Sequence, residues 1–433
     1  MQIILLSGGS GKRLWPLSND VRSKQFLKIF KTESGEYESM VQRIYRSLKD
    51  AMPDANITVA TSESQVSSLR NQLSDKVNIC IEPARRDTFP AIALACFYLK
   101  DVKKISEDET VLVCPVDSYV DMDYFEAIKS IGEKVETTKA NLVLMGIKPT
   151  YPSEKYGYII TDQEGKVKGF KEKPDLNTAK KLLIEKALWN GGVFGFKLGY
   201  MLKKSHELLS INGYDDLQRD YLSQKKISVD YAVVEKEESI EVETFSGNWI
   251  DVGTWKTLTD VCKESTIGNV VIDDTCENTH VFNELDVPVL AMGLKDIVVA
   301  ASADGILVAD KHQSSYMKPY VDTIEAPVMY AEKSWGSYKV LDAETSSLTV
   351  KVTLNPGHQM NYHSHERRDE VWTVLEGQGE AIVDGITKKI KPGDVIALPK
   401  GSKHMLKAET LLKVMEVQCG TDIDVKDKTV YKL

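Results

Sequence analysis

The 433-residue sequence has no excess of basic charge, no hydrophobic run long enough to cross a membrane and no Cys-x-x-Cys pair. Its net charge of −9 argues against nonspecific nucleic-acid binding, although a few local Lys and Arg residues suffice for a phosphate ligand. No stretch approaches the roughly 18–20 apolar residues of a membrane helix, and the chain starts on an apolar strand without a basic leader. We therefore expect a cytoplasmic enzyme with reduced, buried cysteines and with no nucleic-acid or membrane partner.

The first half of the chain alternates short apolar strands with amphipathic helices. Its composition, 42% hydrophobic and 27% charged residues, is that of a globular protein, and the length suggests two to three domains. The alternation predicts an α/β, Rossmann-like domain over residues 1–265, with a mainly parallel sheet and ligands beyond the carboxyl ends of its strands. The expected strands are Gln2–Leu6, Ile57–Ala60, Val111–Cys114 and Asn141–Gly146, and the expected helices include Pro90–Lys100 and Tyr124–Glu136.

Two β-rich patterns follow. Residues 266–329 contain short β-branched runs between turn residues, which predicts a small β-rich linker domain, similar to a β-solenoid. Residues 330–433 contain many short strands between Gly and Pro turns, which predicts an all-β barrel or jelly roll. The expected strands are Asn269–Ile272, Val287–Leu290, Ile297–Ala301, Gly305–Ala309, Leu348–Leu354, Glu370–Leu375, Gly379–Val383, Val395–Leu398 and Leu411–Glu416.

A glycine-rich stretch directly follows the first expected strand: Leu6-Ser-Gly-Gly-Ser-Gly-Lys-Arg-Leu-Trp-Pro-Leu-Ser18. Glycines let the backbone approach a polyphosphate and direct N–H groups at it, so Gly8, Gly9 and Gly11 are candidate phosphate-binding residues. Lys12 and Arg13 come next, and Arg13 can neutralise negative charge that develops during phosphoryl transfer. A tight strand-to-helix turn with incidental charge explains such a loop equally well when it stands alone.

Further motifs follow this loop in a set order. They are Ser23-Lys-Gln-Phe-Leu27, Glu82-Pro-Ala-Arg-Arg-Asp-Thr-Phe-Pro-Ala91, Cys114-Pro-Val-Asp117, Tyr156-Gly-Tyr-Ile159, Phe170-Lys-Glu-Lys-Pro174, Trp189-Asn-Gly-Gly192 and Trp249-Ile-Asp-Val-Gly253. In this order they resemble the sugar-phosphate nucleotidyltransferases. Within that group the chain is similar to the mannose-1-phosphate guanylyltransferases with a C-terminal cupin domain of the type II phosphomannose isomerase kind. The resemblance spans essentially the whole chain.

The resemblance implies transfer of GMP from GTP to mannose 1-phosphate with Mg²⁺, giving GDP-mannose and pyrophosphate. The sugar-phosphate oxygen is already a nucleophile, so catalysis is mostly alignment and charge neutralisation. The implied catalytic residues are Arg13, Lys24, Asp117 and Asp251, of which Asp117 and Asp251 hold Mg²⁺. The implied nucleotide-binding residues are Gly8, Gly9, Gly11, Lys12, Arg13 and Glu82, and the implied sugar-phosphate-binding residues are Gly157, Glu172, Lys173 and Asn190.

Three positions depart from the family pattern. Asp87 stands where the base-side motif commonly has Asn, Ser118 stands where His follows the Asp, and Gly191 stands where Ser precedes Gly. The first bears on the guanine assignment, since a carboxylate can itself accept from a purine amino group, and the third bears on the sugar. Neither touches the phosphate chemistry. Another hexose or a heptose 1-phosphate therefore stays open as the substrate.

The C-terminal pattern contains both cupin motifs. Gly357-x5-His363-x-His365-x4-Glu370-x6-Gly377 fits the first, and Gly393-x5-Pro399-x-Gly401-x2-His404 fits the second apart from its final residue. His363 and His365 are two residues apart on an expected strand and so point to one face, while Glu370 and His404 come from neighbouring strands. Three imidazoles and a carboxylate suit Zn or a similar transition metal, whereas a lone His-x-His is usually incidental.

The matched family often isomerises fructose 6-phosphate to mannose 6-phosphate at this cupin. With Trp372 aligned to the family signature, Arg368 and Glu370 match, but Arg367 and Val371 replace histidines. Losing two imidazoles puts the proton transfer in doubt, so two alternatives stay open: a bifunctional enzyme, or a structural or sugar-sensing cupin without catalysis. The β-rich middle segment is a candidate dimerisation surface, so a homodimer also stays open.

Overall fold

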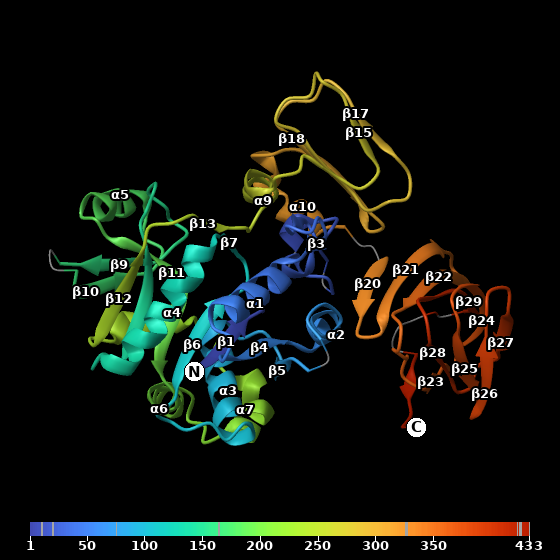
Figure 1. Cartoon of the computed structure of the whole chain (residues 1–433), viewed down its shortest axis with the longest axis horizontal. Coiled ribbons are helices and arrows are strands. Elements are labelled where there is room, and N and C mark those ends of the chain that lie inside the picture. The colour runs from blue at the N-terminus through green and yellow to red at the C-terminus, as the bar shows by residue number, and fades with distance from the viewer. Residues whose placement is uncertain are drawn as a thin grey trace. The chain divides into compact units, whose positions relative to one another are not determined.

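The computed structural model describes residues 1–9, 12–19, 21–74, 76–162, 165–324, 328–421, 423 and 427–432 (Figure 1). The chain forms two compact units. The N-terminal unit comprises Met1–Ser10, Gln25–Val66 and Lys76–Lys263, and the β-rich unit comprises Gly11–Lys24, Ser67–Asp75 and Glu264–Leu433. The segment of residues 11–24 is therefore grouped with the C-terminal half of the sequence rather than with the strand that precedes it.

The N-terminal unit is built on a mixed β-sheet. Its strands are β1 (Gln2–Leu6), β4 (Asn56–Ser62), β5 (Asn78–Glu82), β6 (Thr110–Pro115), β8 (Leu142–Ile147), β9 (Tyr158–Thr161), β10 (Val167–Lys171), β11 (Leu188–Lys197) and β12 (Ile240–Phe245). The order is β10-β9-β11-β6-β1-β4-β5, with β8 between β11 and β12. β6, β1, β4 and β5 run parallel, as the sequence pattern predicts. The other half departs from it, because β11 runs antiparallel to β6, β8 and β9.

Two small antiparallel ladders accompany this sheet. One joins β2 (Phe30–Lys31) to β3 (Tyr37–Glu38). The other joins β7 (Ser118–Val120), which directly follows β6, to β13 (Trp249–Asp251), which lies far along the sequence. This second ladder matters for the site, because it brings the ends of two distant segments together.

Helices cover both faces of the large sheet (Figure 1). The helices of this unit are α1 (Met40–Ala51), α2 (Glu63–Gln72), α3 (Thr88–Phe97), α4 (Met122–Thr137), α5 (Leu176–Ile184), α6 (Leu198–Leu209), α7 (Tyr214–Asp220), α8 (Val229–Ala232) and α9 (Trp255–Val261), of which α9 lies away from the sheet. α3 is apolar on all sides and is buried in one core cluster with the sheet, α6, α7 and α8. α4 packs on the other face, where Gly195 of β11 leaves room for Ile131: a Cβ there would lie 2.6 Å from it.

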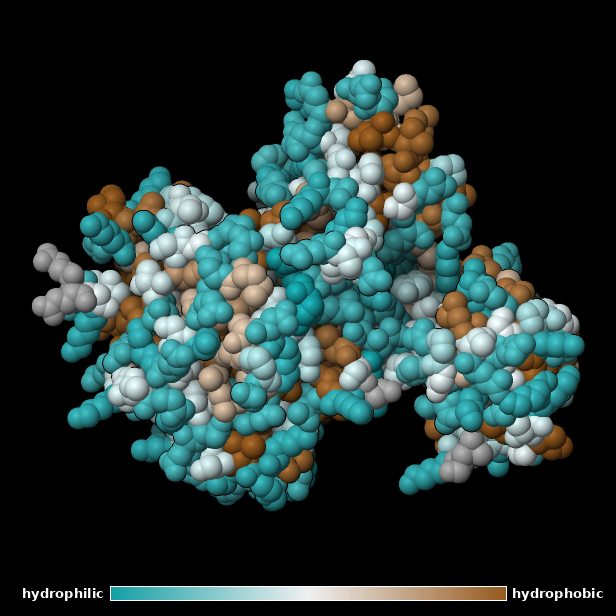
Figure 2. Space-filling view, in the orientation of Figure 1, coloured by the Kyte–Doolittle hydropathy of each residue, from teal (hydrophilic) through white to brown (hydrophobic). Residues whose placement is uncertain are grey.

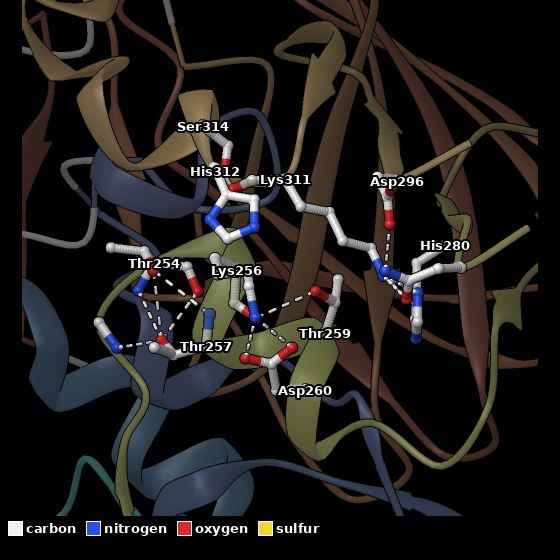
Figure 3. A network of polar contacts seen from close by, with 12 residues as sticks. Thr254, Lys256, Thr257, Thr259, Asp260, His280, Asp296, Lys311, His312 and Ser314 are labelled. Atoms are coloured by element: carbon white, nitrogen blue, oxygen red, sulfur yellow. Dashed lines mark hydrogen bonds and ion pairs between the residues drawn. The ribbon is translucent and has the colours of Figure 1, made fainter. Parts of the chain in front are cut away.

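The segment after residue 264 folds as short parallel ladders, as the solenoid-like pattern predicts. Its strands are β14 (Thr266–Ile267), β15 (Val270–Ile272), β16 (His280–Asn283), β17 (Val289–Ala291), β18 (Ile297–Ser302) and β19 (Gly305–Asp310), followed by α10 (Lys318–Val321). β14, β16 and β18 pair in parallel, as do β15 and β17, and β19 returns antiparallel to β18. Buried Lys311 donates to Asn278 (2.6 Å) and to His280 (2.9 Å), which ties two of these coils together (Figure 3).

The C-terminal residues form two antiparallel sheets with one shared apolar core. The orders are β20-β21-β22-β29-β24-β27 and β26-β25-β28-β23-β30. Trp372, fully buried, lies in this core with side chains from both sheets, as a jelly-roll barrel requires. The strands are β20 (Tyr330–Lys333), β21 (Gly336–Ala343), β22 (Ser347–Leu354), β23 (His363–Ser364), β24 (Arg368–Glu376), β25 (Gly379–Val383), β26 (Ile386–Ile390), β27 (Val395–Leu398), β28 (His404–Ala408), β29 (Leu412–Gly420) and β30 (Thr429–Val430).

Two expectations from composition can be compared with this fold. All six cysteines are free, and Cys80, Cys96 and Cys114 are buried, whereas Cys419 is exposed. Within the described residues, no helix combines the length and the apolar character needed to span a bilayer.

Candidate active site and cupin metal centre

The first half of the glycine-rich loop follows β1 in the N-terminal unit. Gly9 has a φ of 124°, a conformation that favours glycine, and a side chain there would meet open space. Its carbonyl accepts hydrogen bonds from Gln65 (3.2 Å) and Arg85 (3.3 Å). Gln25 donates to the Ser7 carbonyl at 3.0 Å. These contacts fix the loop and leave it open to a ligand.

Glu82 ends β5 beside this loop. Its Oε1 lies 3.9 Å from the place of a Cβ on Gly8, and its Oε2 accepts the Tyr221 hydroxyl at 3.1 Å. Burial raises the pKa of Glu82 to about 7, although the Tyr221 hydrogen bond and the charge of Arg85 oppose the rise. A buried carboxyl group at this edge of the sheet is suited to accept N–H groups of a bound base.

The second half of the loop lies in the β-rich unit. Lys12–Leu14 forms a 3₁₀ turn in which Arg13 is exposed and Leu14 is buried. Lys24 opens a second 3₁₀ turn, Lys24–Phe26, and is half-buried. Gly11 lies outside the described residues. The two expected phosphate cations, Arg13 and Lys24, are thus carried by one segment of the β-rich unit.

Asp117 and Asp251 are brought together from distant parts of the sequence. Asp117 follows β6, and Asp251 ends β13, where the β13–β7 ladder places it opposite Ser118. The Val252 N–H donates to the Asp117 carbonyl at 3.2 Å. Burial raises the pKa of Tyr156, and the negative charges of both carboxylates add to the rise, so the two groups act on one side chain. Two such carboxylates are the hard oxygen ligands that suit Mg²⁺.

The expected sugar-phosphate residues also meet, and they do so around Asp230. A Cβ on Gly157 would lie 2.4 Å from Glu172 Oε2, so glycine is needed to leave room for that carboxylate. The Asn190 N–H donates to the Gly157 carbonyl (2.8 Å), and the Asn190 side chain donates to Asp230 (2.6 Å). Lys173 Nζ lies 2.9 Å from Glu172 Oε1. The four residues therefore form one cluster with Asp230, here called the polar cluster.

Asp230 belongs to the polar cluster, although no sequence motif points to it. Burial and the negative charge of Glu172 raise its pKa to about 6, while Lys173 and the Asn190 hydrogen bond oppose the rise. It lies in α8, a single short turn whose sequence carries no spacing signal. Only the fold brings it to Asn190, 40 residues earlier in the chain.

Two departures from the family pattern have local structural roles. Asp87 has a φ of 69° and caps α3 by accepting the Thr88 N–H at 2.8 Å, and Asn and Asp are the side chains that best tolerate such a conformation. Gly192 has a φ of 72°, and its N–H donates to Asn190 Oδ1 at 3.1 Å. A Cβ on Gly191 would lie 3.1 Å from Ile147, which leaves little room for a larger residue.

His363, His365 and His404 converge inside the C-terminal barrel. Their ring centroids are 4.5–5.3 Å apart, and their ligand atoms lie within 4.8 Å of one another. In each ring Nδ1 faces a backbone carbonyl, which leaves Nε2 to accept a proton or a metal. The carbonyls belong to Asn361 (2.6 Å), Asp427 and Ser402 (2.9 Å) respectively.

The protonation of these rings fits a metal centre. Burial, helped by the charge of Lys428, lowers the pKa of His363 to about 2, and burial lowers that of His365 to about 4. Burial also lowers the pKa of His404, so all three rings are neutral at pH 7. The buried His404 Nε2 has no hydrogen-bond partner within the described part of the chain. Neutral imidazoles with one orphaned ring nitrogen are suited to hold a transition metal.

Glu370 reaches this cluster from the opposing sheet. The prediction that Glu370 and His404 come from neighbouring strands is therefore wrong. Glu370 lies on β24 and His404 on β28, and the barrel brings these strands face to face. Glu370 Oε1 lies 3.2 Å from His365 Nε2, and Oε2 lies 3.4 Å from His404 Nε2. Arg368 donates to Glu370 (2.9 Å) and to His365 Nε2 (3.0 Å). A metal on His365 would take the place of that Arg368 hydrogen bond.

Sequence reasoning missed a second buried carboxyl group in the barrel. Glu416 Oε2 accepts the Trp372 indole N–H at 3.2 Å, and Gln418 donates to its other oxygen at 2.5 Å. Burial and the charge of Glu370 raise the pKa of Glu416 to about 7. Its place on β29 between alternating apolar residues is typical of a barrel strand and carries no motif.

The sequence of the chain is similar to known proteins over nearly its whole length. The nucleotidyl transferase family matches residues 2–266, and the cupin domain family matches residues 350–417. The chain belongs to the nucleotidyl transferase family. Mannose-1-phosphate guanylyltransferase of Escherichia coli K12 is 30% identical to it, over 98% of this chain and 96% of that protein. Mannose-1-phosphate guanylyltransferase ManC of Salmonella typhimurium LT2 and xanthan biosynthesis protein XanB of Xanthomonas campestris B100 have the same identity and coverage.

A solved structure agrees with this assignment. A Thermus thermophilus protein described as a mannose-1-phosphate geranyltransferase is 30% identical to the chain with a TM-score of 0.63. The alignment covers 75% of this chain and 99% of that one. The protein is a sugar-1-phosphate nucleotidyltransferase with a C-terminal cupin domain.

Proposed function

We propose that this transferase moves GMP from GTP to mannose 1-phosphate, releasing pyrophosphate and giving GDP-mannose. Similarity to mannose-1-phosphate guanylyltransferases along nearly the whole chain carries the proposal. The N-terminal unit supports it, because it holds a glycine loop, a pair of carboxylates and the polar cluster with Gly157, Glu172 and Asn190.

The proposed reaction needs little covalent help from the protein. A phosphate oxygen of the sugar phosphate attacks the α-phosphorus of GTP, the new P–O bond forms, and the bond to the β-phosphate bridging oxygen breaks. Gly8, Gly9, Gly11 and Lys12 hold the triphosphate, Arg13 and Lys24 neutralise its charge, and Glu82 accepts N–H groups of the base. Because the nucleophile is already ionised, alignment and charge neutralisation supply most of the rate.

Mg²⁺ is the proposed cofactor of this step, and the donor set fits it. Asp117 and Asp251 offer carboxylate oxygens from two segments that the β7–β13 ladder holds together. A bound Mg²⁺ neutralises phosphate charge and orients the phosphates. The protein contributes the two ligands and keeps them in register through the Val252 hydrogen bond.

The cupin is proposed to hold Zn or a similar transition metal on His363, His365, Glu370 and His404. The neutral rings and the orphaned His404 nitrogen support this. Isomerisation of mannose 6-phosphate and fructose 6-phosphate at the cupin is a second candidate function. It is supported by two carboxyl groups of raised pKa: Glu370, which contacts His365 and His404, and Glu416, whose negative charge acts on His404.

A homodimer is proposed on the surface of the parallel ladders. Val271 and Leu290 pair across β15 and β17 and are 56% and 65% exposed, with Met292 at 61% beside them. Figure 2 shows apolar side chains gathered over these strands. An apolar strip of this kind is a typical contact between copies, and the mass of the purified chain in solution tests it.

A substrate panel tests the main proposal. Pyrophosphate release is measured with Mg²⁺ for four nucleoside triphosphates, each paired with mannose, glucose and heptose 1-phosphates. GTP with mannose 1-phosphate should give the highest kcat/KM. A higher value with a heptose 1-phosphate would move the substrate assignment and leave the reaction class unchanged.

Replacing Gly157 with alanine tests whether the polar cluster binds the sugar phosphate. The new Cβ would come within 2.4 Å of Glu172 Oε2 and 2.5 Å of Phe170, so Glu172 must move. We expect KM for mannose 1-phosphate to rise by at least about tenfold while KM for GTP stays nearly constant. Gly169→Ala is the matched control. Gly169 lies on strand β10, and a Cβ added there would meet no atom within 4 Å. Equal KM values for mannose 1-phosphate in both variants and the parent would exclude Glu172 as a sugar-phosphate-binding residue.

A further inference from the structure

Residues 15–22 separate the two cations of the loop, Arg13 and Lys24, yet the proposed chemistry uses none of them. Several of their side chains are nevertheless buried. Leu17, Ser18, Asn19 and Arg22 are at most 9% exposed. Trp15, Pro16, Asn19 and Arg22 contact residues of the β-rich unit that lie between Glu284 and Tyr330 in the sequence.

The strongest of these contacts is an ion pair at the end of the segment. Arg22 Nη1 and Nη2 donate to the two oxygens of Glu284 at 2.7 and 2.9 Å, and the guanidinium lies 5.1 Å from the centre of the Tyr330 ring. Glu284 directly follows β16. A two-pronged pair fixes the direction of the Arg22 side chain as well as its position. The Arg22 side chain is 8% exposed and that of Glu284 is 33% exposed. Lys24 follows two residues later.

Asn19 forms a second connection in the middle of the segment. Its Oδ1 accepts the Val21 and Arg22 N–H groups (2.9 and 2.6 Å), which closes a tight turn. Its Nδ2 donates to Asp304 Oδ2 at 2.7 Å, and Asp304 Oδ1 accepts the Met329 N–H at 2.7 Å. Asp304 lies in the turn between β18 and β19.

The same turn holds the start of the segment. The Ser302 hydroxyl donates to the Pro16 carbonyl at 2.7 Å. Gly305 lies against the Trp15 ring so closely that a Cβ would come within 2.5 Å of Trp15 Cζ2. Trp15 follows Arg13 by two residues, so both cations are flanked by anchored positions.

We propose that Glu284, Ser302, Asp304 and Gly305, here called the loop clamp, are positioning residues for nucleotidyl transfer. This rests on the proposed function, in which Arg13 and Lys24 contact the triphosphate. Long cationic side chains reach a phosphate correctly only when their backbone is fixed, and a misplacement of about 1 Å costs on the order of a hundredfold in rate. The loop clamp fixes that backbone through its contacts with Trp15, Pro16, Asn19 and Arg22. The solenoid-like strands are therefore part of the catalytic apparatus.

A full-length Glu284→Gln variant tests this. It removes one charge from the pair, keeps the side-chain shape and leaves every proposed substrate contact intact. Asp286→Asn is the matched control, because Asp286 lies two residues away, is 91% exposed and forms a surface pair with Lys339 at 3.1 Å. Both proteins are assayed well below their melting temperature, with the cupin metal content as a measure of correct folding of the β-rich unit.

The loop clamp predicts a specific kinetic pattern. Glu284→Gln should lower kcat/KM for GTP by at least about tenfold, with KM for mannose 1-phosphate within about twofold of the parent, while Asp286→Asn stays parental. A contact that only stabilises the fold would lower the melting temperature and leave both kinetic constants of the folded protein unchanged. That second pattern overturns the proposal.

Ser302→Ala decides the question if Glu284→Gln does not fold. It deletes the hydrogen bond to Pro16 and the one that the Ser302 hydroxyl accepts from the Asp304 N–H at 3.1 Å, both within the loop clamp. It should lower kcat/KM for GTP in the same selective way. Parental constants in folded Ser302→Ala would overturn the loop clamp. If the parent itself releases no pyrophosphate from GTP and mannose 1-phosphate, the proposed substrates fail, and the same variants are then compared on the best pair of the substrate panel.

Discussion

Asp251→Asn is expected to lower kcat for nucleotidyl transfer by about a thousandfold, roughly 4 kcal/mol of transition-state stabilisation. The substitution keeps the shape of the side chain and removes the charge that would hold Mg²⁺ beside Asp117. Since Asp251 lies at the end of β13, the pairing with β7 does not depend on its carboxylate. The fold and the affinity for the sugar phosphate should therefore survive.

Asp260→Asn is the matched control for this variant. Asp260 lies on α9 and forms an exposed pair with Lys256 one turn away, so its loss should leave kcat within about twofold of the parent. Steady-state pyrophosphate release over a range of Mg²⁺ concentrations is the measurement. If Asp251→Asn turns over at the parental rate at low Mg²⁺, the carboxylate pair is not the metal site.

His404→Ala should abolish stable metal binding by the cupin. It removes the buried ring nitrogen that has no hydrogen-bond partner in the described structure and breaks a set of three neutral imidazoles. Loss of a ligand should lower the affinity for the metal by more than the roughly 10–100-fold lost when a residue that hydrogen-bonds to a ligand is replaced. Metal analysis after dialysis should find about one transition metal per parental chain and almost none in the variant.

The control for the cupin is His358→Ala. His358 precedes β23 and lies outside the imidazole cluster, with its ring facing the Pro356 carbonyl at 3.1 Å, so it should keep the metal. Equal metal content in the parent and in His404→Ala would exclude the cluster as the site. A metal-loaded parent that leaves fructose 6-phosphate unchanged would remove the second candidate function and leave the cupin a binding module.

The order of the elements follows well from local sequence patterns. β1, β25 and β27 have the bounds expected from their apolar runs, because turn residues flank each of them. The direction of β11 could not be predicted from the local sequence. This ten-residue strand pairs with β6, β8 and β9, and pairing with these distant strands decides its direction. The same holds for Glu370, whose sheet is decided by how the barrel closes.

The residues of the site follow a similar rule. Gly157, Glu172 and Asn190 were found because they lie in recognisable motifs, and the structure brings them together. Asp230 and Glu416 were missed, because each joins its site through a contact with a residue distant in the sequence. The division of the loop between the two units could not be predicted either, because it depends on contacts of Trp15 and Asn19 with Gly305 and Asp304, which lie far along the sequence.

Identification of the reaction product tests the proposed nucleotidyl transfer and its metal site together. Pyrophosphate release from GTP and mannose 1-phosphate with Mg²⁺ is followed side by side for the parent, Asp251→Asn and Asp260→Asn, and the sugar product is identified by mass. The parent and Asp260→Asn should form GDP-mannose at similar rates, and Asp251→Asn should form almost none. No GDP-mannose from the folded parent would exclude the proposed reaction, and equal rates from all three proteins would exclude Asp251 as a metal ligand.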